Sequence, residues 1–218
     1  LYTYGEAERC PSRRLISVVY FAIIVPMSIL LGVVSGMRGA SRLDRTISIA
    51  SIVTTSVPEF ASGAFLAFIF VVWLGVLPGT STLDTGGGWS LASQLVLPVA
   101  VMVVYDLGYV VRVVRASMIE VMTRPYTRTA VLKGLTFRDV ILKHALRNAM
   151  IPVITYVGMD LAFLMGGAVV TETVFAWPGL GRLAVQALRQ KDIPVVLGTV
   201  LFTSALIVVA NLLTDLSY

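Results

Sequence analysis

Five long segments of this chain carry almost no charge. A bilayer core of roughly 30 Å is crossed by about 20 helical residues, because each residue of an α-helix advances about 1.5 Å. The uncharged segments are at least that long, and only Glu59, Asp106 and Asp160 interrupt them. They predict an all-α membrane protein, a polytopic helical bundle in a single domain over residues 1–218, with five transmembrane helices. The predicted spans are about 15–37, 46–77, 94–116, 148–171 and 193–214.

The composition excludes most classes of soluble protein. Apolar residues make up 57% of the 218 residues, charged residues make up 13%, and the mean hydropathy is +0.88. Such a chain is neither disordered nor a nucleic-acid-binding domain, although its net charge is +5. Its apolar runs do not alternate with polar residues as the strands of a membrane β-barrel do. Because Cys10 and His144 are the only residues of their types, we expect no disulfide framework, no metal site and no catalytic residues.

The second span is too long for one straight helix. Residues 46–77 would extend about 48 Å as an α-helix, which exceeds the thickness of the bilayer core. Pro58 marks the expected break, because proline lacks a backbone N–H and clashes with the preceding turn. The break is either a broken helix that lines a cavity or an ordinary kink in a tilted helix, and we favour the kink.

The basic residues predict the orientation of the bundle. Lys and Arg concentrate in the cytoplasmic loops of membrane proteins. Residues 37–45 and 112–147 together hold eleven of the 17 basic residues, so we place both connections in the cytoplasm. Residues 78–93, in which Asp84 is the only charged residue, are then external.

A short helix is predicted between two breaks in the longer basic connection, about 117–147. Helix is disfavoured at Arg124 because Pro125 follows it. Residues 126–133 then have the pattern of a two-turn helix, which Gly134 terminates in a left-handed conformation. A short helix held between two breaks is suited to docking in a groove of a soluble partner. A solvated basic loop without a docking role is the equal alternative.

A second helix is expected directly after the short one. Thr136 and Asp139 have the spacing of a capping box, which marks a helix start. The apolar face of this helix should lie against the protein rather than in water. It consists of Phe137, Val140, Ile141 and His144.

The sequence of this loop is similar to a known signature. Residues 127–153 (TRTAVLKGLTFRDVILKHALRNAMIPV) resemble the cytoplasmic EAA loop of bacterial ABC importer permeases, in the dipeptide, oligopeptide and nickel branch. Residues 56–58 (SVP) and 171–182 (TETVFAWPGLGR) are similar to segments of the same permeases. Arg128 stands where the wider superfamily has glutamate, and Glu59 follows Pro58 where many relatives have an apolar residue.

The resemblance implies the architecture of a type I ABC importer permease with six spans, of which this chain would lack the first. It also implies that the short helix is the coupling helix, which fits a cleft of the ATP-hydrolysing subunit and transmits its movement. The coupling residues so implied are Tyr126, Thr127, Arg128, Thr129, Ala130, Lys133, Gly134 and Leu135.

The partners follow from the same resemblance. They would be a second homologous permease, two ATP-binding cassette subunits, an extracytoplasmic substrate-binding protein and the lipid of the bacterial inner membrane, with no nucleic acid. The sequence has no phosphate-binding P-loop pattern, so ATP and Mg would be bound by the partner subunits and this chain would bind no cofactor. The expected cargo, moved by alternating access, is di- or oligopeptides. Nickel, glutathione, opines or sugar conjugates carried by the same architecture, or an ion-coupled secondary transporter, are the alternatives.

Glu59, Asp106 and Asp160 are the candidates for the translocation pathway. A charge within the membrane is costly unless it faces water or a partner group. Hydrogen bonds between helices are the competing explanation for each of these acids.

An external amphipathic segment is expected at about residues 173–192. Leu180, Leu183, Ala184, Ala187 and Leu188 recur there at helical spacing. This segment would lie over the external mouth of the bundle, or it would be a helix that only packs against the bundle. The candidate residues of the mouth are Trp177, Pro178, Gly179, Leu180, Gly181 and Arg182.

Overall fold

The computed structural model describes residues 6–81, 89–166 and 168–217, and in these ranges it contains helices and no strands. The predicted all-helical class is confirmed. Four helices are long and apolar enough to cross a membrane, and a fifth span results if one bent pair is counted as a single span. In chain order the elements are α1 (Glu6–Met37), α2 (Arg42–Ser56), α3 (Glu59–Ala67), a π-helix (Phe68–Trp73), α4 (Leu91–Thr123), α5 (Pro125–Leu132), α6 (Phe137–Asp139), a second π-helix (Val140–Ala145), α7 (Leu146–Ala149), α8 (Ile151–Gly166), α9 (Val169–Val174), α10 (Leu180–Gln190) and α11 (Ile193–Ser217).

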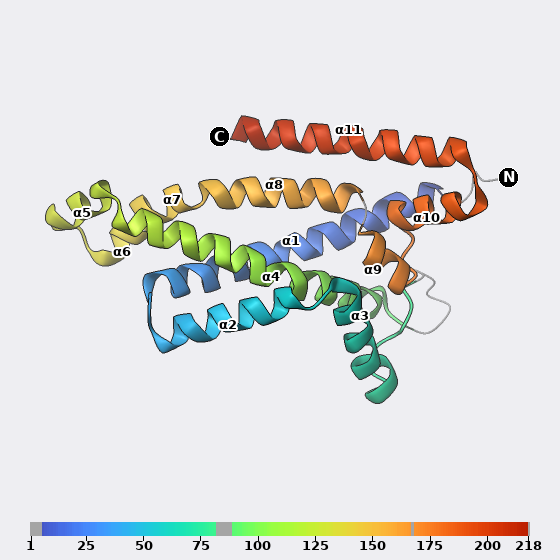
Figure 1. The fold of residues 1–218 in the computed structure, drawn as a ribbon, viewed down its shortest axis with the longest axis horizontal. Helices are drawn as coiled ribbons and strands as arrows, with labels where there is room; N and C mark the ends of the chain where they lie inside the picture. Colours follow the sequence, from blue (N-terminus) through green and yellow to red (C-terminus); the bar gives the residue numbers. More distant parts are fainter. Residues whose placement is uncertain (1–5, 82–88, 167, 218) are drawn as a thin grey trace.

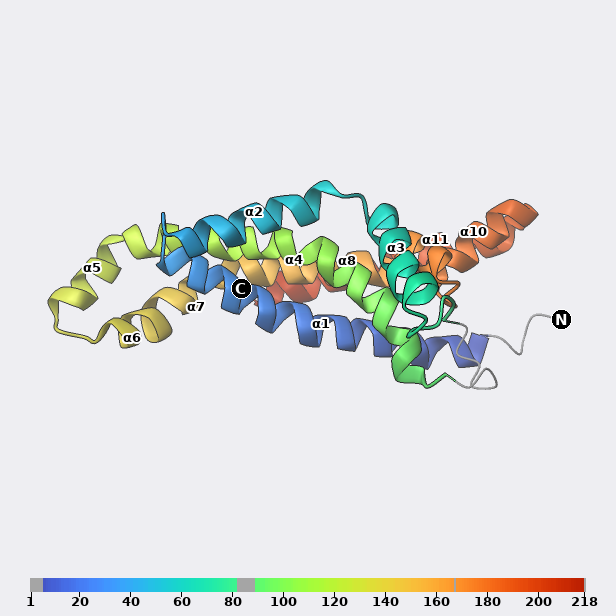
Figure 2. The same cartoon turned by 90° about the horizontal axis from the view of Figure 1, so that it is seen from below.

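The long helices lie side by side around α4 (Figure 1). α1, α2 and α8 pack against α4, and α11 packs antiparallel to α8. Figures 1 and 2 show α5 and α6 projecting from the end of the bundle that also holds the α1–α2 connection. We call this end of the bundle the basic end, because the Arg- and Lys-rich residues 38–45 and 124–138 lie there. The two basic connections therefore share one side of the bundle, while α3, α9 and α10 lie at the opposite end.

The second predicted span is broken at Pro58 rather than kinked. α2 ends at Ser56, Val57 is extended with φ −91° and ψ 124°, and α3 begins at Glu59. The axis turns by 94° between α2 and the helical segment that ends at Trp73. Proline has no N–H to continue the helix, and its ring forces the preceding residue out of the helical region. Our preferred interpretation, one kinked helix over residues 46–77, is therefore wrong.

The remaining spans occur with shifted limits. Residues 15–37 and 94–116 lie within the longer helices α1 and α4, and residues 193–214 lie within α11. The segment predicted as one span over 148–171 corresponds to Ile151–Val174, which is long and apolar enough to cross a membrane. Its described parts are α8, over Ile151–Gly166, and α9, over Val169–Val174.

The close approach of α1 to α4 forms the centre of the bundle. A Cβ atom at Gly32 would lie 2.5 Å from the Cβ of Val114, and one at Gly36 would lie 2.8 Å from the Cβ of Met118. Small residues four apart allow two helix backbones to approach within a membrane. Around this contact α1, α4, the second π-helix, α7 and α8 share one apolar core, in which Val114 and Met118 are fully buried.

Replacing Gly32 with valine is expected to destabilise the bundle by about 1–3 kcal/mol, because the new side chain overlaps Val114 and forces the helices apart. The thermal unfolding midpoint of the purified full-length protein measures this effect. Gly198→Val on α11 is the matched control, since a Cβ atom there meets no atom within 4 Å. Equal losses in the two variants would contradict the assigned role of Gly32.

Candidate functional site

The short helix predicted in the basic loop is present as α5. Arg124 is extended between α4 and α5, and Pro125 occupies the first turn of α5, where its missing N–H is not needed. Gly134 follows the helix with φ +79°, and its N–H donates to the carbonyl oxygen of Val131 at 3.0 Å. The glycine thus supplies the left-handed stop that the sequence predicted.

Two of the predicted coupling residues are buried instead of facing outward. Thr127 is 2% exposed, and its hydroxyl donates to the carbonyl oxygen of Val121 at 2.8 Å. Ala130 is also buried. The other six predicted residues, Tyr126, Arg128, Thr129, Lys133, Gly134 and Leu135, are exposed.

The outer surface of α5 combines apolar and basic side chains. Leu132 is 81% exposed and Val131 is 53% exposed, beside the exposed side chains of Arg128 and Lys133. The predicted coupling helix included Leu132 and Val131, but sequence reasoning did not name them individually. Their signal was available, since both are apolar residues of a short segment bounded by two breaks.

The helix after α5 has its start where predicted, but its buried face is different. The Thr136 hydroxyl accepts a hydrogen bond from the Asp139 N–H at 3.2 Å. Val140, Ile141 and Ala145 are buried, whereas Phe137 and His144 are exposed, so the prediction for these last two residues is wrong. Residues 140–145 form a π-helix, in which residues five apart align, so Ala145 takes the inward position expected for His144.

Ion pairs and hydrogen bonds surround the same helix start. The Lys143 ammonium group lies 2.8 Å from the Asp139 carboxylate. This contact, together with the Thr136 hydroxyl, lowers the pKa of Asp139. The pair is exposed, and its small contribution to stability would be lost as the pH falls through the lowered pKa of Asp139.

An ion pair that the sequence did not predict joins the α1–α2 connection to α4. The guanidinium group of Arg115 donates to both carboxylate oxygens of Asp44, at 2.5 and 2.8 Å. Asp44 is 4% exposed and also accepts hydrogen bonds from the Ser35 hydroxyl at 2.5 Å and the Ala40 N–H at 3.1 Å. The sequence places both residues in or beside basic connections but does not predict the pair, because partners 71 positions apart leave no local signal.

The three acids predicted for the pathway have different surroundings. Asp160 is buried on α8, and one of its oxygens lies 2.7 Å from the hydroxyl of Tyr20 on α1. Asp106, half-buried on α4, approaches the same hydroxyl at 2.7 Å. Glu59 has a different hydrogen-bond partner, since it accepts from the Thr171 hydroxyl of α9. The structure therefore brings two of the three together, through a tyrosine that sequence reasoning missed.

The predicted external segment is folded back onto the bundle. α10 forms at the expected amphipathic residues, but Leu188 on that stripe is exposed. None of the six candidate mouth residues is exposed, and Trp177, Gly179 and Gly181 are buried. Glu172 of α9 is 5% exposed, and its carboxylate accepts the Arg182 N–H at 2.9 Å. These contacts favour the packing alternative for this part of the segment.

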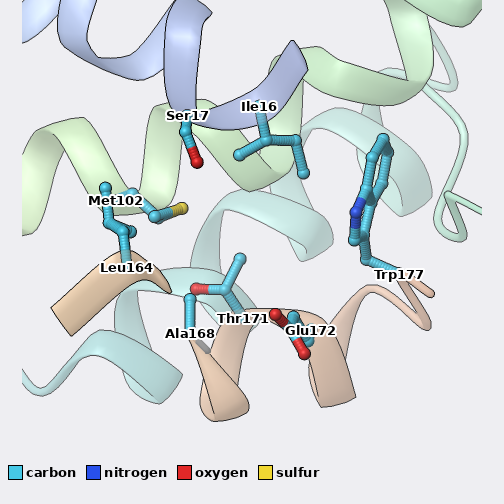
Figure 3. Close-up of a pocket in the computed structure, with 8 residues that line it drawn as sticks. All are labelled: Ile16, Ser17, Met102, Leu164, Ala168, Thr171, Glu172 and Trp177. Atoms are coloured by element: carbon cyan, nitrogen blue, oxygen red, sulfur yellow. The ribbon is translucent and has the colours of Figure 1, made fainter. Parts of the chain in front are cut away.

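A small pocket lies beneath the external segment (Figure 3). Its enclosed space is about the size of one water molecule, so no peptide fits at this point in the present conformation. Figure 3 shows the Trp177 indole and the Glu172 carboxylate at its rim. The lining residues are Ile16, Ser17, Met102, Leu164, Ala168, Thr171, Glu172 and Trp177.

Replacing Arg115 with glutamine is expected to destabilise the protein by roughly 1–3 kcal/mol, because the buried Asp44 carboxylate loses its charged partner. A further Asp44→Asn substitution should recover part of this loss, since it removes the unpaired charge. Chemical or thermal unfolding of the full-length protein with Arg115→Gln, with Asp44→Asn and with both substitutions measures the coupling. Additive losses in the double variant would show that the pair is not coupled.

Comparisons with known proteins agree with this architecture. Residues 28–218 match the family described as binding-protein-dependent transport system inner membrane component. The chain is 39% identical over 215 residues to a putative peptide transport system permease protein of Brucella abortus, covering 97% of the chain and 68% of that protein. It is 36% identical over 213 residues to the oligopeptide transport system permease protein AppB of Bacillus subtilis, covering 96% of the chain and 67% of AppB. It is 36% identical over 206 residues to a probable peptide ABC transporter permease protein of Sinorhizobium fredii, covering 93% of the chain and 65% of that protein.

A family match that covers most of the chain, together with relatives at this level of identity, decides the class of protein. It favours the importer over the ion-coupled secondary transporter that the sequence had left as an alternative. The chain belongs to the family of binding-protein-dependent transport system inner membrane components and is a permease subunit of an ABC importer.

Proposed function

We propose that this subunit moves peptides through the bacterial inner membrane, driven by ATP hydrolysis in partner subunits. The relatives named above are peptide and oligopeptide permeases, which supports this class of cargo. The complex would contain a second similar permease, two ATPase subunits that bind ATP and Mg, and an extracytoplasmic protein that delivers the peptide. The observation that carries the proposal is α5, a short helix with exposed apolar side chains that projects from the basic end.

α5 has the properties of a docking element for an ATPase subunit. The basic end faces the cytoplasm by the distribution of Lys and Arg. Leu132 and Val131 are therefore exposed to water and not to lipid, and burial of such side chains in a cleft is favourable. Arg128 and Lys133, exposed beside them, would surround this contact with positive charge.

The way α5 is held explains how its movement would reach the membrane. Thr127 bonds it to the last turn of α4, which is one helix of 33 residues and about 50 Å long. On the other side the Ser117 hydroxyl of α4 donates to the Ala149 carbonyl oxygen of α7 at 2.9 Å. A displacement of α5 would therefore move α4 and α7 together, as rigid-body rocking of spans in alternating access requires.

One side of α4 is suited to line the pathway. Tyr105 is 39% exposed and Tyr109 is 45% exposed, and half-buried Asp106 lies between them in the sequence. Polar and ionisable groups at membrane depth face a cavity or a protein neighbour and avoid lipid. Asp106 and Glu59 thus stay as pathway candidates, whereas buried Asp160 belongs to the packing between helices.

Uptake of labelled di- and oligopeptides by cells with and without this subunit tests the proposed cargo.

Replacing Leu132 with serine is expected to weaken ATPase binding, because it removes the most exposed apolar side chain of α5. The ATPase recovered with the tagged complex should fall at least about tenfold, the effect of roughly 1.4 kcal/mol. Leu142→Ser is the matched control, as Leu142 is 53% exposed in the same loop but outside α5. Equal recovery of the ATPase in the two variants would contradict docking through α5.

Gly134→Val should reduce peptide uptake by the assembled complex, because a valine at φ +79° is strained by about 1–2 kcal/mol or more. Gly134→Asn is the control, since asparagine tolerates the left-handed conformation and a Cβ atom there meets no atom within 4 Å. Uptake and ATPase recovery are measured in parallel. If valine and asparagine transport equally well, the backbone conformation at this position has no part in coupling.

A further inference from the structure

Three helices meet at a single hydroxyl group inside the bundle. Tyr20 of α1 is fully buried. Its hydroxyl oxygen lies 2.7 Å from an oxygen of Asp106 on α4 and 2.7 Å from an oxygen of Asp160 on α8. Both distances are typical of good O–H···O hydrogen bonds.

Hydrogen-bond accounting limits the charge of this group. A tyrosine hydroxyl has one proton, so it donates to only one of the two carboxyl groups. The other contact is a hydrogen bond only if that carboxyl group is protonated and donates to the tyrosine oxygen. With both carboxylates ionised, one 2.7 Å contact would join two oxygens with no proton between them, close to a second negative charge.

The surroundings do not offset two negative charges. In the described part of the chain, neither carboxyl group has a Lys, Arg or His nitrogen within 4.0 Å. Glu59 of α3 adds to the negative charge acting on Asp106. The Tyr156 hydroxyl of α8 donates to Asp106 over a long 3.4 Å, and its ring stacks on Tyr109.

Among the described residues, a cation is recorded against the Tyr109 ring and not against the two carboxyl groups. The Arg112 guanidinium group of α4 lies 5.8 Å from the centre of the Tyr109 ring. Two close carboxylates in a poorly solvated site do not both ionise, because each charge disfavours the other and both lose hydration.

We propose that Asp106 and Asp160 hold one proton in common at neutral pH, and that the resulting chain of carboxyl, Tyr20 hydroxyl and carboxylate latches α1, α4 and α8 together. We call these three residues the latch. The latch carries one negative charge and satisfies both 2.7 Å contacts. It does not depend on the peptide cargo, so it stands or falls separately from the proposed function.

The latch is accessible to protons from one side. Asp160 and Tyr20 are buried, but Asp106 is half-buried on the side of α4 that holds exposed Tyr109. Loss of the shared proton at high pH would leave two repelling carboxylates on different helices. The helices would then be held less tightly, and a rise in pH would loosen this part of the bundle.

Infrared difference spectroscopy, which compares the assembled complex in lipid at neutral and at high pH, tests the shared proton directly. The wild-type complex should show the carbonyl absorption of a protonated carboxyl group at neutral pH. Asp160→Asn and Asp106→Asn should each abolish it, because an amide supplies the N–H donor and the remaining carboxylate accepts from Tyr20. Asp215→Asn, which changes an exposed acid on α11, should leave it intact. No such absorption in the wild type, or its survival in either single variant, overturns the proposal.

A second measurement tests the latch as a contact between helices. The thermal unfolding midpoint of the wild-type complex should fall over the pH range in which the carboxyl absorption disappears. Asp160→Asn should remove this fall, since the amide has no proton to lose over that range, and Asp215→Asn should retain it. If Asp160→Asn unfolds with the same pH dependence as the wild type, the shared proton does not hold the helices together.

Discussion

The close contact between α1 and α4 positions the two polar networks that join these long helices. Gly32 lets the two backbones approach, and the residues on either side of it along α1 are thereby brought to α4. Towards the opposite end, Tyr20 reaches Asp106. Towards the basic end, Ser35 reaches Asp44, which Arg115 of α4 pairs with. One close contact between small and apolar residues thus positions two polar networks.

α4 is the element that connects the ends of the molecule. Its buried residues extend from Gln94 to Val121, and the helix contacts α1, α2, α7 and α8. Close-packed side chains transmit displacement with little compression. Because Thr127 fixes α5 to the end of this helix, a shift at the basic end would be carried into the membrane by a single rigid element.

Local signals in the sequence were sufficient for much of this arrangement. The spans follow from uncharged length, the break follows from Pro58, and the end of α5 follows from Gly134, because each of these features acts within a few residues. The 94° turn at Pro58 was not predictable, since proline stops a helix but neighbouring helices decide where the chain goes next. The π-helix at 140–145 changes the periodicity itself, which exposes His144. Tyr20 lies 86 and 140 positions from its two partners, and no spacing rule relates residues so far apart.

The latch joins α1, α4 and α8 by hydrogen bonds, whereas the break at Pro58 leaves α2 and α3 joined by an extended segment. α1, α4 and α8 share one core and meet at Tyr20. α3 and the first π-helix pack on α4 in a second cluster, in which Phe175 and the α4 residue Val101 are buried, and the Thr171 hydroxyl links α9 to Glu59 of α3. The extended Val57 and Pro58 join α3 to α2 along the chain. A rocking movement that preserves hydrogen bonds at membrane depth would therefore keep the three latched helices as one body and change backbone angles at Val57, where no helical hydrogen bond has to break.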